Sequence, residues 1–347
     1  MANYLNSIYF YNKKCNLRCR HCWIEPDFES SIDNDLKLHE VKDLFLQGKA
    51  LGMSGVKLSG GEPLMLPYIL PLISFLHEEK ISIVLETNGT LINEETAAIL
   101  CQAQAFVSVS LDGTTEKIHN LLRVSAGSFP RAIQGIKHLT TKGIAPQIIF
   151  SLHKQNAFDL PSMIDCAKEL GARSLKINLI RGIGRAKDIE KENDLVSARN
   201  FVDLYREHKD KGDDNFKVLF DLPSAFKTIT DINQDRCNTC GVKGIIGVLS
   251  DGTVSICGIG NIVNELCFGN IREQKLADIW ENTPMLSFIR EEIPKKLEGI
   301  CGRCLLKGMC LGKCIANTYY ATGCLTEGYL FCEEAYKEGI FPGKRLL

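Results

Sequence analysis

Three cysteines near the start of the chain have the spacing of ligands for a metal cluster. Cys15, Cys19 and Cys22 stand as C-x3-C-x2-C in the run KKCNLRCRHCW. Iron-sulfur clusters are normally held by four cysteines, so three thiolates on one short loop could hold three irons of a 4Fe-4S cube and leave the fourth iron open to a ligand. The alternative is a structural zinc ion with His21 as a further ligand. Adjacent residues rarely point at one metal, which disfavours a site that uses both His21 and Cys22.

A glycine-rich turn follows the second β-strand that the sequence predicts. It reads Ser59-Gly60-Gly61-Glu62-Pro63. Two glycines let the backbone approach a ligand closely, and the carboxylate of Glu62 could accept a hydrogen bond from a ligand ammonium group. Alone, such a turn is more often only a turn.

Together, the cysteine triplet and this turn resemble the radical S-adenosylmethionine (radical SAM) superfamily. Members usually carry an aromatic residue before the third cysteine, where this chain has His21. The resemblance implies that the open iron binds the amino and carboxylate groups of SAM. One-electron reduction then gives methionine and a 5′-deoxyadenosyl radical, which removes a hydrogen atom from the substrate. It also implies that Gly60, Gly61, Glu62 and Pro63 bind the methionine amino group of SAM.

Two further strand ends should line the mouth of the same site. The third predicted strand ends in LETNG, which contains Asn88, and the fourth ends in VSVSLDG. By resemblance, Ser110 stands where the family places a ribose contact, and Arg123, in HNLLR, where an arginine reaches the SAM carboxylate. For Asp112, a turn cap and a site role are equally compatible with the sequence. A glycine turn with Arg185 follows the sixth strand, and a ligand role is the less common outcome for such a turn.

Length and composition fit a globular protein of one large domain or two smaller ones. The chain has 347 residues, 45% of them hydrophobic, with 41 basic and 42 acidic side chains intermixed. This allows a sizeable core and shows no basic stripe for nucleic acid. No apolar run approaches the roughly 20 residues that cross a bilayer, and the start lacks the order of a secretory signal. We therefore expect a cytoplasmic protein without nucleic-acid or membrane partners, whose clustered cysteines are metal ligands.

Short β-branched runs alternate with helical patterns up to about residue 180, which predicts repeated β/α units and a parallel sheet. The strands are expected at residues 8–11, 56–58, 82–85, 106–110, 147–152 and 174–179. Six units match the partial (β/α)6 TIM-like barrel of the radical SAM fold. Active sites of such barrels gather at the C-terminal ends of the strands, where the cysteine loop follows the first strand. The fold class is thus α/β, with the barrel at residues 1–180.

The composition of the chain changes at residue 181 and again at residue 237. Residues 181–236 are polar and weakly patterned, with a helix predicted over 195–207, and we interpret them as a bridging region. Residues 237–347 hold ten of the 15 cysteines. We expect this last part to form a second domain with little apolar core, whose folding depends on its metal clusters.

The order of these later cysteines resembles the SPASM domain, whose pattern is C-x(9 to 15)-G-x4-C, then C-x2-C-x5-C-x3-C, then a last cysteine. The ligands of that family interleave, which implies two auxiliary 4Fe-4S clusters here. The first would take Cys240, Cys257 and Cys314. Cys237 is the candidate for its fourth ligand, and without it an open iron could bind peptide. The second would take Cys301, Cys304, Cys310 and Cys332.

The remaining cysteines have weaker assignments. Cys324 competes with Cys332 for the last ligand position, and Cys267 is spare. Cys101 and Cys166 lie in helical patterns and are interpreted as small core residues. A zinc ribbon is the alternative interpretation of the C-terminal region.

A narrower resemblance concerns the substrate. The runs SIYFYNKKCNLRCRHCWIEPDF, SGVKLSGGEPL, LETNG, VSVSLDG and PQIIF resemble maturases of ribosomally made peptides with nitrogen-fixation-related leaders. The best-known activity of that group is the splicease reaction, which excises tyramine from a tyrosine and leaves an α-keto-β-amino acid. The resemblance implies a ribosomal precursor peptide as substrate and an external electron donor such as flavodoxin or ferredoxin. No side chain is identified as catalytic.

Several alternatives stay open at this point. The same radical chemistry could form a cyclophane or thioether crosslink, or epimerise a residue. From another class, the chain could be an iron-sulfur electron carrier or sensor. Because the cluster motif begins at Cys15, we expect no leader-binding domain before it and a separate small leader-binding protein instead.

Overall fold

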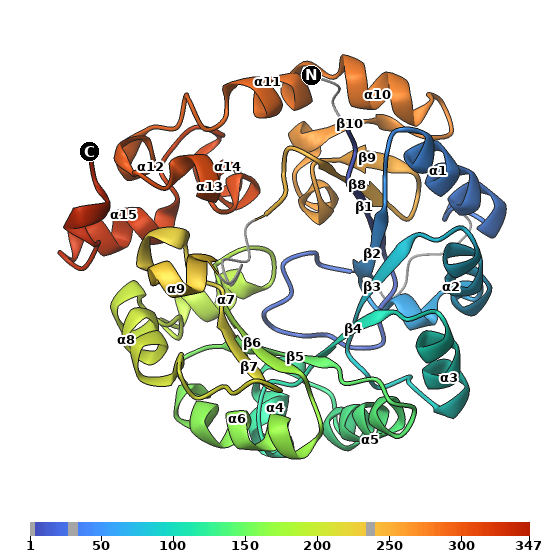
Figure 1. The fold of residues 1–347 in the computed structure, drawn as a ribbon, viewed down its shortest axis with the longest axis horizontal. Helices are drawn as coiled ribbons and strands as arrows, with labels where there is room; N and C mark the ends of the chain where they lie inside the picture. The colour runs from blue at the N-terminus through green and yellow to red at the C-terminus, as the bar shows by residue number, and fades with distance from the viewer. Residues whose placement is uncertain (1–3, 27–33, 234–239) are drawn as a thin grey trace.

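One sheet of ten strands carries the fold within the part of the chain that the structure describes (Figure 1). The structure is a computed structural model and describes residues 4–26, 34–233 and 240–347. Along the sheet the strands follow the order β10-β9-β8-β1-β2-β3-β4-β5-β6-β7. Neighbours from β8 to β7 are parallel, so the C-terminal ends of these strands share one edge. That edge is where barrels of this kind place their active sites.

The six predicted strands are confirmed, each to within two residues of the expected ends. They are β1 (Ser7–Asn12), β2 (Gly55–Gly60), β3 (Ser82–Thr87), β4 (Phe106–Ser110), β5 (Gln147–Leu152) and β6 (Ser174–Leu179). Their central residues are buried or half-buried, because helices cover one face and the barrel interior lies on the other. Continuous runs of Val, Ile, Leu and Phe suit such strands.

Helices alternate with these strands and lie outside them in Figure 1. They are α1 (Leu38–Ala50), α2 (Ile69–Glu78), α3 (Glu94–Gln102), α4 (Glu116–Arg123), α5 (Ser128–Thr141) and α6 (Leu160–Glu169). In α1 the buried side chains include Val41, Leu44 and Phe45, at the spacing of a single apolar helical face. The buried face of α4 is different, because it carries His119 and Arg123 beside Leu122. Among the described residues, no helix has the length and apolar character needed to span a membrane.

The segment interpreted as a bridge holds more regular structure than the sequence predicted. The predicted helix is present as α8 (Ala198–His208), and α7 (Ala186–Lys191) and α9 (Ile229–Asn233) accompany it. A seventh strand, β7 (Lys217–Phe220), extends the sheet in parallel beside β6. This strand was missed because it has only four residues and lies among polar ones.

Three strands from the C-terminal third complete the sheet on its other side. β8 (Ile245–Leu249) pairs in parallel with β1, while β9 (Thr253–Ser255) and β10 (Cys267–Asn270) continue it in antiparallel fashion. The helices that follow are α10 (Leu276–Asn282), α11 (Pro284–Glu292), α12 (Gly299–Arg303), α13 (Lys307–Cys310), α14 (Ile315–Thr322) and α15 (Leu330–Lys337). In Figure 1 these orange and red helices occupy the arc between β10 and α8. The boundaries at residues 180 and 236 stay predictions, since one sheet runs across them.

The C-terminal region has a substantial apolar core. Trp280 and Phe331 are both 1% exposed. The ring of Phe331 packs edge-on against Phe201 and Phe226, with centroids 6.2 and 5.3 Å away. Aromatic burial of this kind is a large contribution to stability. The expectation that this region has little apolar core is therefore wrong.

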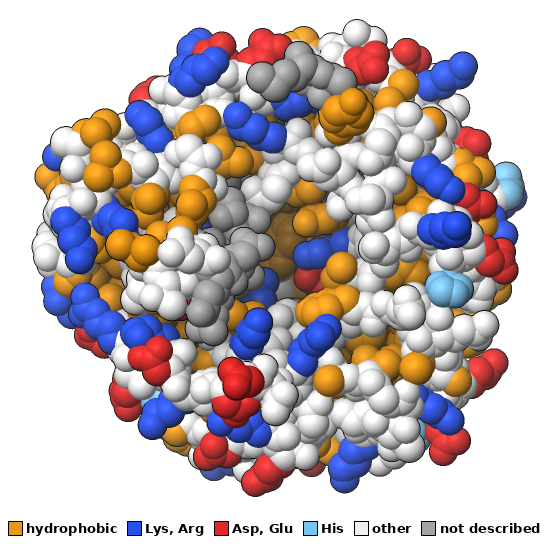
Figure 2. Space-filling model, in the orientation of Figure 1, with side chains coloured by type: hydrophobic (Ala, Val, Ile, Leu, Met, Phe, Trp, Pro, Cys, Tyr) orange, Lys and Arg blue, Asp and Glu red, His pale blue; other side chains and the backbone are white. Residues whose placement is uncertain are grey.

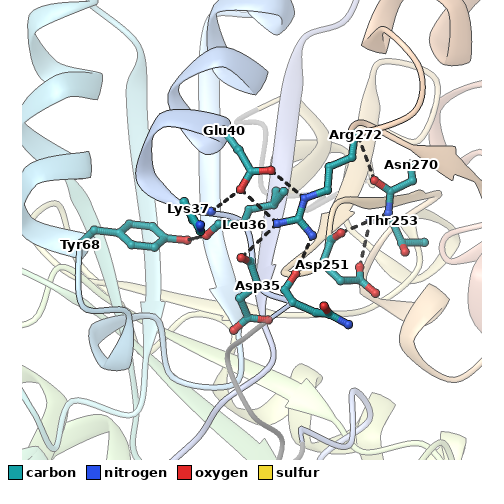
Figure 3. Close-up of polar contacts among 10 residues, drawn as sticks. Asp35, Leu36, Lys37, Glu40, Tyr68, Asp251, Thr253, Asn270 and Arg272 are labelled. Atoms are coloured by element: carbon teal, nitrogen blue, oxygen red, sulfur yellow. Dashed lines mark hydrogen bonds and ion pairs between the residues drawn. The ribbon is translucent and has the colours of Figure 1, made fainter.

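A polar contact also ties the C-terminal region to the first helix (Figure 3). Arg272, just after β10, donates from Nε and Nη2 to the two carboxylate oxygens of Glu40 at 2.7 and 3.0 Å. It also donates to the backbone oxygens of Asn34 and Asp35. These hydrogen bonds lower the pKa of Glu40 to about 2. The planar fork of one arginine thus joins the start of α1 to the β10 edge.

Candidate active site

The cysteine loop is fixed against the tip of β2 by backbone contacts. Buried Asn12 donates from Nδ2 to the backbone oxygens of Lys14 and Glu62, each at 2.7 Å. The Gly61 N–H donates to Asn12 O at 2.6 Å. A Cβ on Gly60 would lie 2.4 Å from Asn12 O, and one on Gly61 would lie 2.1 Å from Lys14 O. The two glycines therefore allow the backbone at the end of β1 and at the start of the cysteine loop to approach β2 closely.

One cavity of about 460 Å³ joins the two groups of cysteines that the sequence singled out. Its lining includes Cys15, Cys19 and Cys22 from the loop after β1, and Cys240, Cys257 and Cys314 from the C-terminal region. Figure 2 shows the molecule from the side of Figure 1, hollowed near its middle, with hydrophobic and Lys or Arg side chains at the hollow. Of the predicted SAM-binding residues, the lining includes Gly60, Gly61, Asn88, Ser110 and Arg123.

Burial disfavours the free thiolate form of a cysteine in each of the two groups. Burial raises the pKa of Cys15 and that of Cys240 to about 12. Coordination to iron would stabilise the thiolates that burial disfavours. Among the described residues, no three Cys, His, Asp or Glu side chains converge closely enough for a single metal ion.

Arg123 lies between the cysteine loop and a buried carboxylate. Its Nε donates to Asp112 Oδ2 at 2.5 Å, and its Nη1 lies 3.5 Å from Cys19 Sγ. The other oxygen of Asp112 accepts from Ser151 N at 2.7 Å. Burial would raise the pKa of Asp112, but the charge of Arg123 and these hydrogen bonds bring it down to about 2. Asp112 therefore positions Arg123, and its own contact with a ligand stays a prediction.

Glu62 and Pro63 lie behind the cavity wall and are not among its described lining residues. Glu62 is fully buried and accepts hydrogen bonds from Leu64 N, Thr87 Oγ1 and Asn88 N at 2.7 to 3.0 Å. These bonds tie the tip of β2 to that of β3. Contact of Glu62 with SAM stays a prediction. In the structure its carboxylate oxygens accept hydrogen bonds that position Asn88.

The second set of predicted cluster ligands meets at a separate small cavity. Cys301, Cys304, Cys310 and Cys332 all line a space of about 20 Å³. Cys324 is not among the described lining residues there; its thiol lies 3.2 Å from Thr326 Oγ1. Cys237 lies outside the described residues. The structure thus brings together the four cysteines assigned to one cluster and three of the four assigned to the other.

The other cysteines are dispersed. Cys101 is exposed on α3, with its thiol 3.0 Å from the backbone oxygen of Lys142, so its assignment to the core is wrong. Its position on the helix puts it on the outer face, which the helical spacing alone did not reveal. Cys166 is partly buried, and Cys267 donates to Gly260 O at 3.4 Å near the β10 edge.

Several polar residues of the cavity were not found from the sequence. Lys57 and Glu86 pair at 2.8 Å across β2 and β3, and both line the cavity. Because successive side chains of a strand point to opposite faces of the sheet, the positions of these two residues in β2 and β3 could have indicated that they face the barrel interior. Asn178 and His21 each keep a buried polar atom, Oδ1 and Nδ1, without a hydrogen-bond partner among the described residues. Such atoms at a cavity wall fit a polar ligand like SAM.

Comparison with known proteins supports this reading of the site. Residues 9–167 match the Radical SAM superfamily, and residues 237–305 match SPASM, described as an iron-sulfur cluster-binding domain. An AdoMet-dependent heme synthase of Methanosarcina barkeri is 30% identical, over 95% of each chain. The mycofactocin maturase MftC of Mycobacterium ulcerans is 28% identical, over 90% of this chain and 83% of its own.

A solved structure has the same fold. SuiB of Streptococcus suis, bound to the precursor peptide SuiA, superposes with a TM-score of 0.74 and 19% identity, over 95% of this chain and 76% of its own. This TM-score and the two family matches confirm the predicted TIM-like α/β fold with a C-terminal SPASM region. The chain therefore belongs to the radical SAM superfamily with a SPASM domain, and its cofactors are SAM, the 4Fe-4S cluster that binds it, and auxiliary iron-sulfur clusters.

Proposed function

We propose that the chain is a maturase that modifies a ribosomally synthesised precursor peptide by radical SAM chemistry. The observation that carries the proposal is the shared cavity, which is lined by Cys15, Cys19 and Cys22 and also by Cys240, Cys257 and Cys314. A peptide side chain held there would lie between the site of radical generation and an auxiliary cluster. A relative named as a maturase and the peptide-bound structure of SuiB support a peptide as the substrate.

In this proposal, residues of the chain bind and orient the cofactor. Cys15, Cys19 and Cys22 hold the cluster that binds SAM, and Arg123, fixed by Asp112, meets the SAM carboxylate. Ser110 and Asn88 complete the polar wall at the ends of β4 and β3. When bound, SAM and its cluster supply a 5′-deoxyadenosyl radical that removes a hydrogen atom from the substrate.

The finer proposal is that the reaction excises tyramine from a tyrosine of the core peptide and leaves an α-keto-β-amino acid. It rests on the resemblance of the barrel motifs to maturases of peptides with nitrogen-fixation-related leaders. A separate leader-binding protein and an external reductant, flavodoxin or ferredoxin, complete it. Pull-down of the chain with the precursor peptide tests the leader-binding protein, and tight leader binding by this chain alone would contradict it.

A tetrapyrrole is the second candidate substrate. The relative that is 30% identical over nearly the whole chain is named a heme synthase. The cavity also carries two arginines besides Arg123, namely Arg181 and Arg185, which could face the carboxylates of such a molecule. This candidate predicts that a porphyrin, and no peptide, changes in mass.

The test is anaerobic incubation of the reconstituted protein with SAM, a reductant and the candidate peptides encoded beside its gene, read by mass spectrometry. Tyramine excision lowers the peptide mass by a tyramine-sized unit, a crosslink lowers it by two hydrogens, and epimerisation leaves it unchanged. The triple Ala variant of Cys15, Cys19 and Cys22 is the control and should form no 5′-deoxyadenosine. If the intact protein also forms none, the chain is an electron carrier or sensor and the proposal fails.

A further inference from the structure

The turn between β6 and α7 lies between the two groups of cavity cysteines. Arg185 donates from its backbone N–H to Cys22 O at 3.1 Å, and a Cβ on Gly184 would lie 2.8 Å from the same oxygen. On its other side, Ile183 packs in one apolar cluster with Cys240, Cys257 and Cys314. Gly184 has a φ of +58°, which lets the chain turn this closely. Arg185 is therefore held where a substrate between the two groups would lie.

Arg185 is one of the residues that line the cavity. Its Nε and Nη2 are buried and have no hydrogen-bond partner among the residues that the structure describes. Three other cationic side chains at the cavity wall each have an acidic partner. Lys57 pairs with Glu86 at 2.8 Å, Arg123 with Asp112 at 2.5 Å, and Arg181 lies 3.8 Å from Glu334.

Buried N–H groups that lack an acceptor are costly even on a half-buried arginine, and an anionic ligand removes that cost. Nε and Nη2 form the edge of the guanidinium that matches the two oxygens of a carboxylate. We infer that Arg185 binds a carboxylate of the substrate, while Arg123 serves SAM. The inference rests on the proposed function. The carboxylate could belong to an acidic side chain or the C-terminus of a peptide, or to a propionate of a tetrapyrrole.

The first arm of the test changes the protein. Arg185→Gln in the anaerobically reconstituted enzyme should raise the KM or Kd for the carboxylate substrate by roughly 10- to 100-fold. Arg185→Lys should recover only part of this, because an ammonium cannot make the bidentate contact. Lys191→Gln, on the exposed side of α7, removes a charge without touching the cavity and should leave substrate binding unchanged. The cluster's electron paramagnetic resonance signal and its response to SAM should persist in Arg185→Gln.

The second arm changes the ligand. One set of probes is the precursor peptide with each Asp or Glu replaced by its amide, and with an amidated C-terminus. The other is hemin and its dimethyl ester. The probe that lacks the contacted carboxylate should bind the wild type as weakly as the intact probe binds Arg185→Gln, and it should lose nothing further in that variant.

The outcomes separate this inference from the proposed function. Arg185-dependent binding of hemin, lost in its ester, supports the inference and contradicts a peptide substrate. Arg185-dependent binding of an acidic peptide supports both. The inference is overturned if Arg185→Gln binds every probe as the wild type does, if its loss is equal for acid and amide probes, or if it loses the response to SAM and keeps substrate affinity.

Discussion

Asp112 and Arg123 form an ion pair, 2.5 Å long, beside the cysteine loop, and are 0% and 6% exposed. The second oxygen of Asp112 is held by Ser151 N, so the carboxylate has one orientation. Arg123 is thereby directed past Cys19 toward the cavity before any ligand binds. A preset guanidinium loses little freedom when it meets a carboxylate, which is an advantage for SAM binding.

Asp112→Asn should weaken SAM binding and destabilise the fold. The variant leaves Arg123 buried without its counter-charge, a change that costs about 3 to 5 kcal/mol in comparable pairs. Calorimetric titration with SAM should show an affinity loss of roughly 10-fold or more. Asp203→Asn, in an exposed pair with Arg206, is the control and should change neither quantity. Equal stability and SAM affinity in Asp112→Asn and wild type would contradict this role.

The same pair fixes the expected pH dependence. The pKa of Asp112 is lowered from 3.8 to about 2, so its stabilising charge is complete above about pH 4 and is lost only as pH falls toward 2. SAM affinity measured between pH 6 and 9 should therefore show no titration of Asp112. A loss of affinity in Asp112→Asn that disappeared at the acid end of this range would be inconsistent with the pair.

Gly60→Ala and Gly61→Ala should prevent the cysteine loop from docking on β2. The new Cβ would lie 2.4 Å from Asn12 O at the end of β1 in the first variant and 2.1 Å from Lys14 O in the loop in the second, and Gly60 also has a φ of +104°. We expect loss of the SAM-binding cluster, measured as iron and sulfide content and by the resonance signal of the reduced cluster. Gly343→Ala, where a Cβ meets nothing within 4 Å, should bind iron normally. Normal cluster content in both β2 variants would show that the loop does not need this close approach.

The fold could be predicted where local pattern and tertiary environment agree. β1 to β6 are buried on both faces, so their apolar runs appear directly in the sequence. β7 is short and begins with Lys217, and its place in the sheet depends on pairing with β6. β8 pairs with β1, which precedes it by more than 200 residues. No local pattern encodes such a partner, so the extension of the sheet was not predicted.

The site residues also differ in how far the sequence could predict them. The cysteines could be assigned because each ligand group follows a local spacing, and Cys301, Cys304, Cys310 and Cys332 indeed meet at one cavity. The partner of a charged side chain is instead decided by the fold. Asp112 pairs with Arg123, eleven residues later in the chain. Glu62 instead accepts hydrogen bonds from Thr87, the last residue of β3, and from Asn88, the residue that follows β3. No local pattern indicated that Nε and Nη2 of Arg185 would have no hydrogen-bond partner among the residues that the structure describes.

Cys332→Ser and Cys324→Ser should differ in iron content. Cys332 lines the small cavity with the other three cysteines of its set, and Cys324 does not. Loss of one thiolate from a four-cysteine set should remove about four irons per chain after anaerobic reconstitution. Cys324→Ser should retain the wild-type iron content and serves as the matched control. The reverse result would make Cys324 the last ligand of the second auxiliary cluster.

The pair of Arg272 and Glu40 should contribute modestly to stability and in a salt-dependent way. Their side chains are 36% and 22% exposed, so the coupling energy from Arg272→Gln, Glu40→Gln and the double variant should be about 0.5 to 1 kcal/mol at low salt. It should shrink in 1 M salt, because screening acts on exposed charges. The pKa of Glu40 is lowered from 4.5 to about 2, so the contribution is complete above about pH 4.5 and is lost as pH falls toward 2. Urea unfolding at pH 6 and 8 should give the same coupling, and a coupling that vanished at either pH would mean that the contacts of Figure 3 do not hold the C-terminal region to α1.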